Sequence, residues 1–178
     1  MNYKWYFMTK LLTHAFFNRP AELVAQELLG CTLCVVVNGH VERHEIRETE
    51  AYVGPHDLAS HASKGRTPRT EVMFQKAGTL YVYLIYGMYE MLNIVTGEMD
   101  YPAAVLIRGV GMYDGPGKLT KAMHITRNIN GKALGRKTGI WVEARPHTLQ
   151  RRNISSAPRI GVAYAKEWAH QNLRFFIS

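Results

Sequence analysis

Residues 31–52 read CTLCVVVNGHVERHEIRETEAY, and this stretch decides the kind of fold that the chain adopts. The β-branched run at residues 31–37 indicates a strand, and Asn38-Gly39 is a strong signal for a type I′ hairpin turn. The partner strand continues through residues 40–52, until Gly54-Pro55 ends it. The stretch therefore predicts a long antiparallel hairpin.

The rest of the chain combines further β-rich segments with a few helical ones. A helix is expected after Pro20, with an apolar periodic run that stops at Gly30, and a second one at residues 118–124. Further strands are expected at residues 79–86, 89–95, 103–110, 140–143, 159–164 and 173–177. Strands joined mostly by hairpins, with few helices, predict an α+β fold in one domain that spans residues 1–178.

The basic charge is concentrated in one segment, although the whole chain has a formal net charge of +8. Residues 118–152 contain nine basic residues and one acid, namely Lys118, Lys121, Arg127, Lys132, Arg136, Lys137, Arg145, Arg151, Arg152 and Glu143. A local basic excess favours a polyanionic partner, because each neutralised phosphate releases counterions, although a solvated surface would give the same pattern. A glycine-rich loop precedes Lys118 and Lys121, where backbone amides at a helix start can also meet a phosphate.

Signals for membrane insertion or secretion are not evident. No apolar run approaches the roughly 18 residues of a membrane span. Residues 1–17 mix aromatic side chains with lysine and histidine and lack the apolar core of a signal peptide, so we expect a cytoplasmic protein. Cys31 and Cys34 form a lone C-x-x-C inside the predicted strand without a second ligand pair for zinc, and both are expected to be buried thiols.

Two carboxylates lie on the second strand of the predicted hairpin. Alternation along that strand puts four side chains on one face: Ile46, Glu48, Glu50 and Tyr52. Because Ile46 and Tyr52 favour burial, we expect at least one carboxylate in an enclosed setting, where an unpaired charge is costly. The residues alone leave two explanations open, either a functional acid or an ion pair with Arg43, Arg47 or Arg108.

Four of the ten tyrosines fall within nine residues: Tyr81, Tyr83, Tyr86 and Tyr89. Tyr81 and Tyr83 share one face of a strand, where tyrosine usually packs in the core. Tyr86 falls beside the Gly87 turn, and Met88 makes this tip bulkier. An apolar tip of this kind suits a protein that fills the gap left by an extruded base.

Two other kinds of site fit parts of the same pattern. The tyrosines alone would suit a non-catalytic nucleic-acid-binding module with a stacking platform. Glu48, Glu50 and Asp57, with His61 nearby in sequence, would suit a metal-dependent nuclease. Glycoside hydrolysis fits less well, because its two carboxylates flank the scissile bond rather than project side by side from one strand.

Taken together, ordered segments along nearly the whole chain resemble the alkyladenine (3-methyladenine) DNA glycosylase family of the mammalian type, which lacks a helix–hairpin–helix motif. The segments are ETEAYVGP at residues 48–55, His61, TPR at 67–69, GTLYVY at 78–83, YGMY at 86–89, AVLIR at 104–108, GPGKL at 115–119 and RIGV at 159–162. Each segment alone is a weak match, and their common order makes the resemblance specific.

The resemblance implies roles for the matching residues. Glu50 corresponds to the general base that activates the hydrolytic water, and Arg108 to its partner in holding that water. The implied pocket for the flipped base consists of Tyr52, His61, Tyr83 and Asn93, the last of which disfavours the exocyclic amine of guanine.

The remaining implied roles concern DNA. Tyr86 takes the place of the base in the duplex, with Met88 beside it, and Lys118 and Lys121 are expected to contact the DNA backbone. The implied protein is a monomer without metal or cofactor, which acts on double-stranded DNA containing damaged purines, at the nucleoid if the source is bacterial. Its implied fold is a compact α+β domain around a curved, mostly antiparallel sheet with surrounding helices.

The chemistry of alkylated purines agrees with these roles. Alkylation at N3 or N7 gives the base a positive charge, so it leaves readily, and a general base that aligns water typically contributes about 10²–10⁴-fold. Deaminated purines and ethenoadenine leave as neutral bases and need a proton, and His61 is the candidate acid that the sequence offers. Of the neighbouring residues, Glu48 is expected to be structural and Tyr81 to belong to the core.

Overall fold

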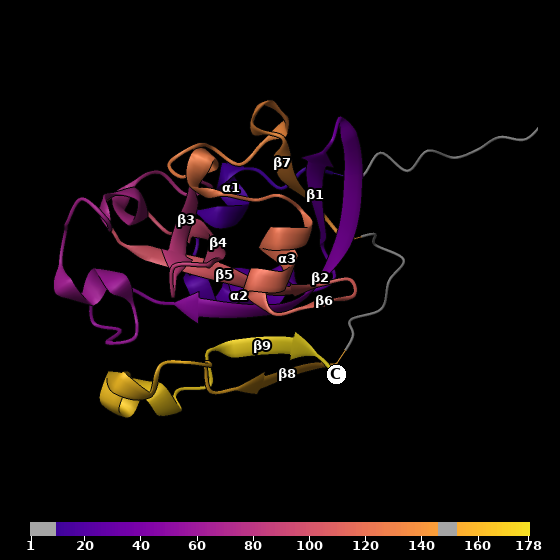
Figure 1. Cartoon of the computed structure of the whole chain (residues 1–178). Coiled ribbons are helices and arrows are strands. Elements are labelled where there is room, and N and C mark those ends of the chain that lie inside the picture. Colours follow the sequence, from indigo (N-terminus) through magenta and orange to yellow (C-terminus); the bar gives the residue numbers. More distant parts are fainter. Residues whose placement is uncertain (1–9, 146–152) are drawn as a thin grey trace, which may run out of the picture.

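The computed structural model describes residues 10–145 and 153–178, which are organised around one antiparallel sheet (Figure 1). Within these residues nine strands pair, with the central order β3-β4-β5-β2-β1-β7, while β6 joins β5 and the β8–β9 hairpin joins β2 through β9. The strands are β1 (Thr32–Val37), β2 (His40–Tyr52), β3 (Leu80–Ile85), β4 (Tyr89–Thr96), β5 (Ala103–Val110), β6 (Tyr113–Asp114), β7 (Ile140–Glu143), β8 (Ile154–Ala157) and β9 (Arg174–Ile177). The predicted α+β fold with a mostly antiparallel sheet is confirmed.

Strand β2 lies between the two parts of the sheet, one formed by β3, β4 and β5 and the other by β1 and β7. Its first half pairs with β1, and its second half pairs with β5 on one side and with β9 on the other. Asn38 (φ 51°) and Gly39 (φ 80°) both have positive φ, as the predicted type I′ turn requires. The hairpin is therefore confirmed, and β2 carries Glu50 and Tyr52 to the middle of the sheet.

Side chains of the central strands alternate between two faces. One face contributes to the main core, where these residues are buried together: Ala51 of β2, Val82 of β3, Leu92 and Ile94 of β4, and Val105 and Ile107 of β5. The intervening residues of the same strands line a cavity on the other face. Because the period of a strand is two, the apolar pattern that fills the core also determines which residues face the cavity.

Three short α-helices occur in the described part of the chain: α1 (His14–Phe17), α2 (Ala21–Leu28) and α3 (Pro116–Ala122). Helix α2 begins directly after Pro20 and packs on β2 and β5, as its apolar periodicity predicts. Helix α3 packs on β4 and β5, and it begins before the predicted residue 118, because Pro116 suits the first turn of a helix. None of the helices in the described ranges is long and apolar enough to cross a membrane.

Within residues 10–145 and 153–178, five 3₁₀ segments complete the connections: η1 (His61–Lys64), η2 (Glu71–Phe74), η3 (Arg127–Ile129), η4 (Arg136–Thr138) and η5 (Ala163–His170). Residues 1–9 and 146–152 lie outside the described residues. They include part of the stretch considered as a signal peptide, and the basic residues Arg151 and Arg152. Cys31 and Cys34 are buried and free, as expected for core thiols.

The C-terminal prediction was wrong in part. Residues 159–164 do not form a strand, because Gly161 (φ 78°) lies in a turn that leads into η5. Strand β8 was not predicted, since its Ser155-Ser156 centre has little β-propensity, and pairing with β9 determines its conformation. The resulting segment (yellow in Figure 1) lies beside β2 and brings residues 160–164 to the cavity.

An irregularity in the pairing of β2 with β5 corrects a second prediction, namely that Ile46 shares a face with Glu50 and Tyr52. The pairing of β2 with β5 shifts register between Ile46 and Glu48 and again between Glu48 and Thr49. Ile46 is buried in the main core, whereas Glu50 and Tyr52 line the cavity. The second shift reverses the first, so the two strands keep the same register on either side of this irregularity, but the two-residue alternation of side chains is interrupted within it.

Candidate active site

A cavity of about 440 Å³ lies on the face of the sheet opposite the main core. Strands β2 to β5, the η1 turn and the C-terminal segment all line it. It brings together the residues expected to act in catalysis and base binding: Glu50, Tyr52, His61, Tyr83, Asn93 and Arg108. Tyr86 also lines the cavity, whereas Met88, Lys118 and Lys121 lie outside it.

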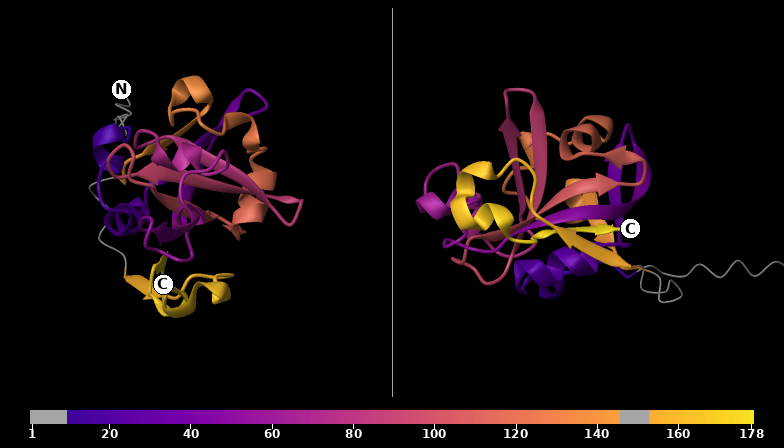
Figure 2. Two further views of the ribbon diagram at one scale, coloured as in Figure 1. Left: turned by 90° about the vertical axis from the view of Figure 1, so that its left-hand side faces the viewer. Right: turned by 90° about the horizontal axis from the view of Figure 1, so that it is seen from below.

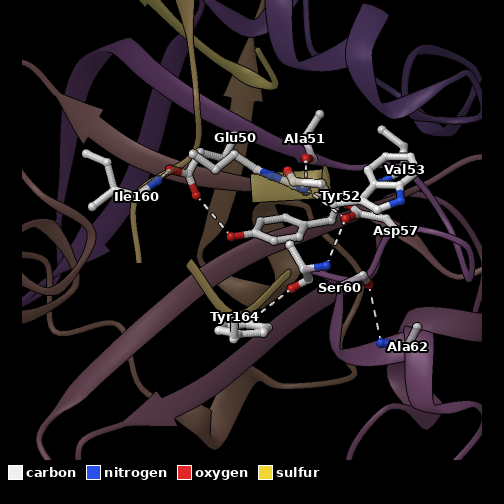
Figure 3. Close-up of polar contacts among 12 residues, drawn as sticks. Glu50, Ala51, Tyr52, Val53, Asp57, Ser60, Ala62, Ile160 and Tyr164 are labelled. Carbon is white, nitrogen blue, oxygen red and sulfur yellow. Dashed lines mark hydrogen bonds and ion pairs between the residues drawn. The ribbon is translucent and has the colours of Figure 1, made fainter. Parts of the chain in front are cut away.

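Glu50 is fully buried in the wall of this cavity. Its Oε1 accepts the backbone N–H of Ile160 at 2.9 Å and lies 3.4 Å from Nη1 of Arg108. Its Oε2 accepts the hydroxyl of Tyr52 at 3.0 Å (Figure 3). Two hydrogen-bond donors and one ion-pair partner, on three segments of the chain, therefore hold this carboxylate in one orientation.

Burial raises the pKa of Glu50 above its ordinary range. The charge of Arg108 opposes this increase most strongly, followed by the hydrogen bonds from Ile160 and Tyr52. A carboxylate with a raised pKa that still keeps donors for its charged form can accept a proton more readily than an exposed one. This combination is typical of a general base.

Glu48 has a different environment from Glu50. Its Oε1 accepts hydrogen bonds from Nε of Arg108 at 3.2 Å and from Nη1 of Arg174 at 3.0 Å. The predicted ion pair with Arg108 is therefore present for both carboxylates, and a functional role of Glu50 stays a prediction. Glu48 is ion-paired and fixes Arg108, while Glu50 faces the cavity beside the same arginine.

Aromatic rings form much of the cavity wall. The rings of His61 and Tyr83 lie 4.6 Å apart at 70°, and those of Tyr81 and Tyr83 lie 5.1 Å apart. The hydroxyl of Tyr81 is 3.0 Å from Nδ1 of His61. Tyr81 is buried, as expected, but it also lines the cavity and orients His61. Such rings attract planar and positively charged groups.

His61 is neutral at pH 7. Burial lowers its pKa to about 4, and the charges of Arg69 and Lys64 act in the same direction. A neutral imidazole is a hydrogen-bonding partner and not a cationic acid. The structure therefore argues against His61 as the group that protonates a leaving base.

Asn93 lies on β4 and is 2% exposed. Its Nδ2 donates to the carbonyl oxygens of Tyr81 and Met91, both at 3.2 Å. These two bonds fix the orientation of the amide in the cavity wall. A fixed polar group of this kind can discriminate between bases by shape and hydrogen bonding.

The turn between β3 and β4 forms an exposed apolar tip, as the sequence predicted. Figure 2 shows this hairpin extending away from the rest of the molecule. Tyr86 has a positive φ of 52° and is 80% exposed, and Met88 is 67% exposed. The tip is thus free to contact a partner, and its insertion into DNA remains a prediction.

Lys118 and Lys121 are exposed on α3. Lys121 and Met88 line the same surface hollow, which also includes Tyr89. The expected phosphate-binding helix and the expected insertion tip therefore adjoin, although contact of either lysine with DNA stays a prediction.

The sequence interpretation missed the C-terminal half of the site. Ile160 contributes a backbone N–H, and no side-chain pattern reports such a donor. Asp57, considered above as a metal ligand, instead forms a fully buried ion pair with Arg159. Within the described ranges, no three His, Cys, Asp or Glu side chains are grouped as metal ligands.

The fold and the site together define a class of enzyme. An enclosed carboxylate in the wall of an aromatic cavity, next to a protruding apolar hairpin, can accept a base extruded from nucleic acid and direct water at its glycosidic bond. This arrangement is that of a DNA glycosylase.

Comparisons with known proteins identify the family. Residues 15–178 match the family described as methylpurine-DNA glycosylase (MPG). The chain is 46% identical over 176 residues to a protein of Myxococcus xanthus, covering 93% of this chain and 89% of that protein. It is 47% identical over 178 residues to one of Legionella pneumophila strain Paris (96% and 95% covered), and 42% identical over 186 residues to one of Methanocella arvoryzae (93% and 92%). All three are named "Putative 3-methyladenine DNA glycosylase". The chain belongs to the methylpurine-DNA glycosylase family.

Proposed function

We propose that this DNA glycosylase hydrolyses the N-glycosidic bond of alkylated purines of the 3-methyladenine and 7-methylguanine type, which leaves an abasic site as the first step of base excision repair. The observation that carries the proposal is the buried carboxylate of Glu50, held by two hydrogen bonds and an ion pair in the wall of an aromatic cavity. The names of the relatives support 3-methyladenine as a substrate.

In the proposed reaction the damaged base is flipped out of the duplex and enters the cavity. Tyr52, His61 and Tyr83 contact the base, and Tyr86 takes its place in the stack with Met88 beside it. Glu50 accepts one proton from a water molecule while the water oxygen bonds to the anomeric carbon of the sugar. The bond between that carbon and the purine nitrogen breaks, and its electron pair leaves with the purine and neutralises the positive charge.

Arg108 and Asn93 have supporting roles in this scheme. Arg108 lies 3.4 Å from Glu50 and is held by Glu48, so it orients the carboxylate and its water. Asn93 disfavours guanine, whose exocyclic amine would meet a rigid amide. Lys118 and Lys121 contact the phosphate backbone of double-stranded DNA, on which the protein acts as a monomer in the cytoplasm.

Cationic alkylated purines are the preferred substrates in this proposal. They depart with their own positive charge neutralised and require no acid. Hypoxanthine and other deaminated purines depart as neutral bases only after protonation, and His61, with a pKa of about 4, holds no proton to give at pH 7. Their release is therefore expected to be slower, and lower pH should not restore it, because Glu50, with its raised pKa, takes up a proton before His61 does.

Incubation with methylated duplex DNA in EDTA tests the proposal. The wild-type protein is expected to release free methylated purines, and Glu50→Gln to bind lesion duplex while releasing none. Glu71→Gln is the matched control, because Glu71 is an exposed carboxylate paired with Arg66, away from the cavity. Release by Glu50→Gln at the wild-type rate would exclude Glu50 as the base.

The same assay separates the rival functions. A non-catalytic binding module would bind in a salt-sensitive manner without releasing any base. A metal-dependent nuclease would cut the phosphodiester backbone and lose activity in EDTA. Neither result is expected for this protein.

A further inference from the structure

The ion pair between Asp57 and Arg159 lies next to the cavity, and the proposed reaction does not use it. Both side chains are 0% exposed, and Nη2 of Arg159 lies 2.8 Å from Oδ1 of Asp57. Nε of Arg159 is buried without a hydrogen-bond partner in the described part of the molecule. Burying two charges is expensive, and an apolar pair of similar volume often stabilises a fold as well or better. A contribution to the stability of the fold is therefore a weak explanation for the presence of this buried ion pair.

The pair connects the C-terminal segment to two adjoining parts of the chain that are distant from it in sequence. Asp57 accepts the backbone N–H groups of Val53 at 3.2 Å and Ala59 at 3.0 Å. Arg159 donates through Nη1 to the carbonyl oxygen of Ala51 at 2.9 Å. The end of β2, the turn after it and the C-terminal segment are thereby joined at one buried point.

The same arginine adjoins two of the groups that hold Glu50. Arg159 directly precedes Ile160, whose N–H donates to Glu50 at 2.9 Å. Its guanidinium carbon lies 4.8 Å from the ring centroid of Tyr52, whose hydroxyl donates to Glu50 at 3.0 Å. Movement of Arg159 would therefore displace a backbone donor and release the ring that carries a side-chain donor.

We propose that Arg159 is a positioning residue for base release: paired with Asp57, it holds the Ile160 N–H and the Tyr52 hydroxyl against Glu50. The proposal rests on the proposed function of Glu50 as the general base. Arg159 itself touches neither the base nor the water, and its effect on the reaction passes through those two donors.

The test compares Arg159→Met with Arg66→Met. Arg66 is a matched control because it also binds a carboxylate through two nitrogens, at 2.8 and 2.9 Å from Glu71, and lies 4.8 Å from an aromatic ring, that of Phe74. It does not line the cavity. Arg66→Met is expected to retain the wild-type rate and pH profile.

Three quantities are measured for each variant: the single-turnover rate of purine release from methylated duplex, the pH dependence of that rate, and the Kd for a duplex with a tetrahydrofuran abasic-site analogue. Arg159→Met is expected to lower the rate roughly 100-fold, because a displacement of about 1 Å can have that effect, while the Kd changes by less than about threefold. Loss of donors to Glu50 should also move the acid limb of the profile to higher pH.

A purely structural role would give a different result. If the Arg159→Met rate stays within about threefold of wild type, or the rate and the Kd worsen by the same factor with an unchanged acid limb, the proposal is overturned. If Arg159→Met does not fold, Arg159→Lys decides the matter, since it keeps a charge near Asp57 but loses the planar fork. A wild-type rate and acid limb in Arg159→Lys would then overturn it.

The wild type and Glu50→Gln, measured in the same assay, show whether the role of Arg159 or the proposed function itself is contradicted. No purine release by the wild type, or full release by Glu50→Gln, contradicts the proposed function itself. Normal behaviour of both, with Arg159 variants that match the wild type, contradicts only the role of Arg159.

Discussion

At the scale of the residue, the burial of Glu50 works against the stability of the fold. Because its pKa is raised in the native state, the unfolded chain loses this proton more readily. The contribution of Glu50 to stability is therefore complete below the ordinary carboxylate pKa and is lost as the pH rises through the raised native value. At pH 7 the buried charge of Glu50 therefore lowers the free energy of unfolding, and a permanently neutral side chain at this position would not.

Glu50→Gln is accordingly expected to raise the Tm by a few degrees at pH 7, and the difference should shrink as the pH approaches about 4. Calorimetry at several pH values measures this. Glu71→Gln provides the opposite case, because the hydrogen bond from Arg66 lowers the pKa of Glu71. Removing the charge of Glu71 should therefore leave the Tm unchanged or reduce it. A lower Tm for Glu50→Gln at pH 7 would contradict the expectation.

The hydroxyl of Tyr52 is the one donor to Glu50 that a conservative substitution removes. Its hydrogen bond favours the charged carboxylate, so Tyr52→Phe should raise the pKa of Glu50 further. Purine release requires the deprotonated form, and the acid limb of the rate profile should therefore move to higher pH. Tyr164→Phe is the control, because the hydroxyl of Tyr164 donates to Ala59 and not to Glu50. An equal displacement of the limb in both variants would refute this role for Tyr52.

At the scale of the element, the β3–β4 hairpin carries the base pocket on its strands and the insertion tip at its turn. Tyr86→Ala should weaken binding to lesion duplex by about 1–3 kcal/mol, the usual contribution of one stacked ring, and should weaken binding to unmodified duplex far less. Met99→Ala is the control, since Met99 is 62% exposed and follows the other end of β4. Fluorescence titrations with both duplexes measure the effect, and an equal loss on each would argue against insertion.

Elements with a regular apolar pattern could be predicted from the sequence, and those fixed by tertiary contacts could not. The hairpin around Asn38-Gly39 and the strands on either side of Gly87 follow from two-residue alternation and turn residues. The irregularity after Ile46 leaves no comparable pattern, because it arises from the pairing of β2 with β5. Strand β8 is equally hidden, since its serines favour a strand only once β9 lies beside them.

Within the site, too, some residues could be predicted from the sequence, while others are fixed only by tertiary contacts. Glu50, Arg108 and the tyrosines were predicted because their side chains carry the chemistry and a family resemblance places them. The Ile160 N–H could not be predicted, since a backbone donor has no signature in sequence. The pairing of Asp57 with Arg159 joins residues that the fold alone brings together.

At the scale of the whole molecule, one sheet provides both the core and the site. Alternate residues of the same four strands fill the core or line the cavity, and the C-terminal segment supplies the last donor to Glu50. Part of the basic excess is neutralised internally, since Arg127 pairs with Glu90 and Arg136 with Glu143. The exposed lysines of α3, beside the hairpin tip, are thus better placed to meet the phosphates of a bound duplex.

The salt dependence of DNA binding tests this placement. Each phosphate contact that is lost should reduce the slope of log K against log salt by about 0.9, so the double variant Lys118→Ala/Lys121→Ala should reduce it by roughly 1.8. Because phosphate contacts carry no lesion information, binding to lesion and to unmodified duplex should weaken by the same factor. Lys76→Ala, which removes an exposed lysine before β3 at the end of the hairpin away from the tip, should leave the slope unchanged. An unchanged slope in the double variant would mean that α3 does not lie against the DNA.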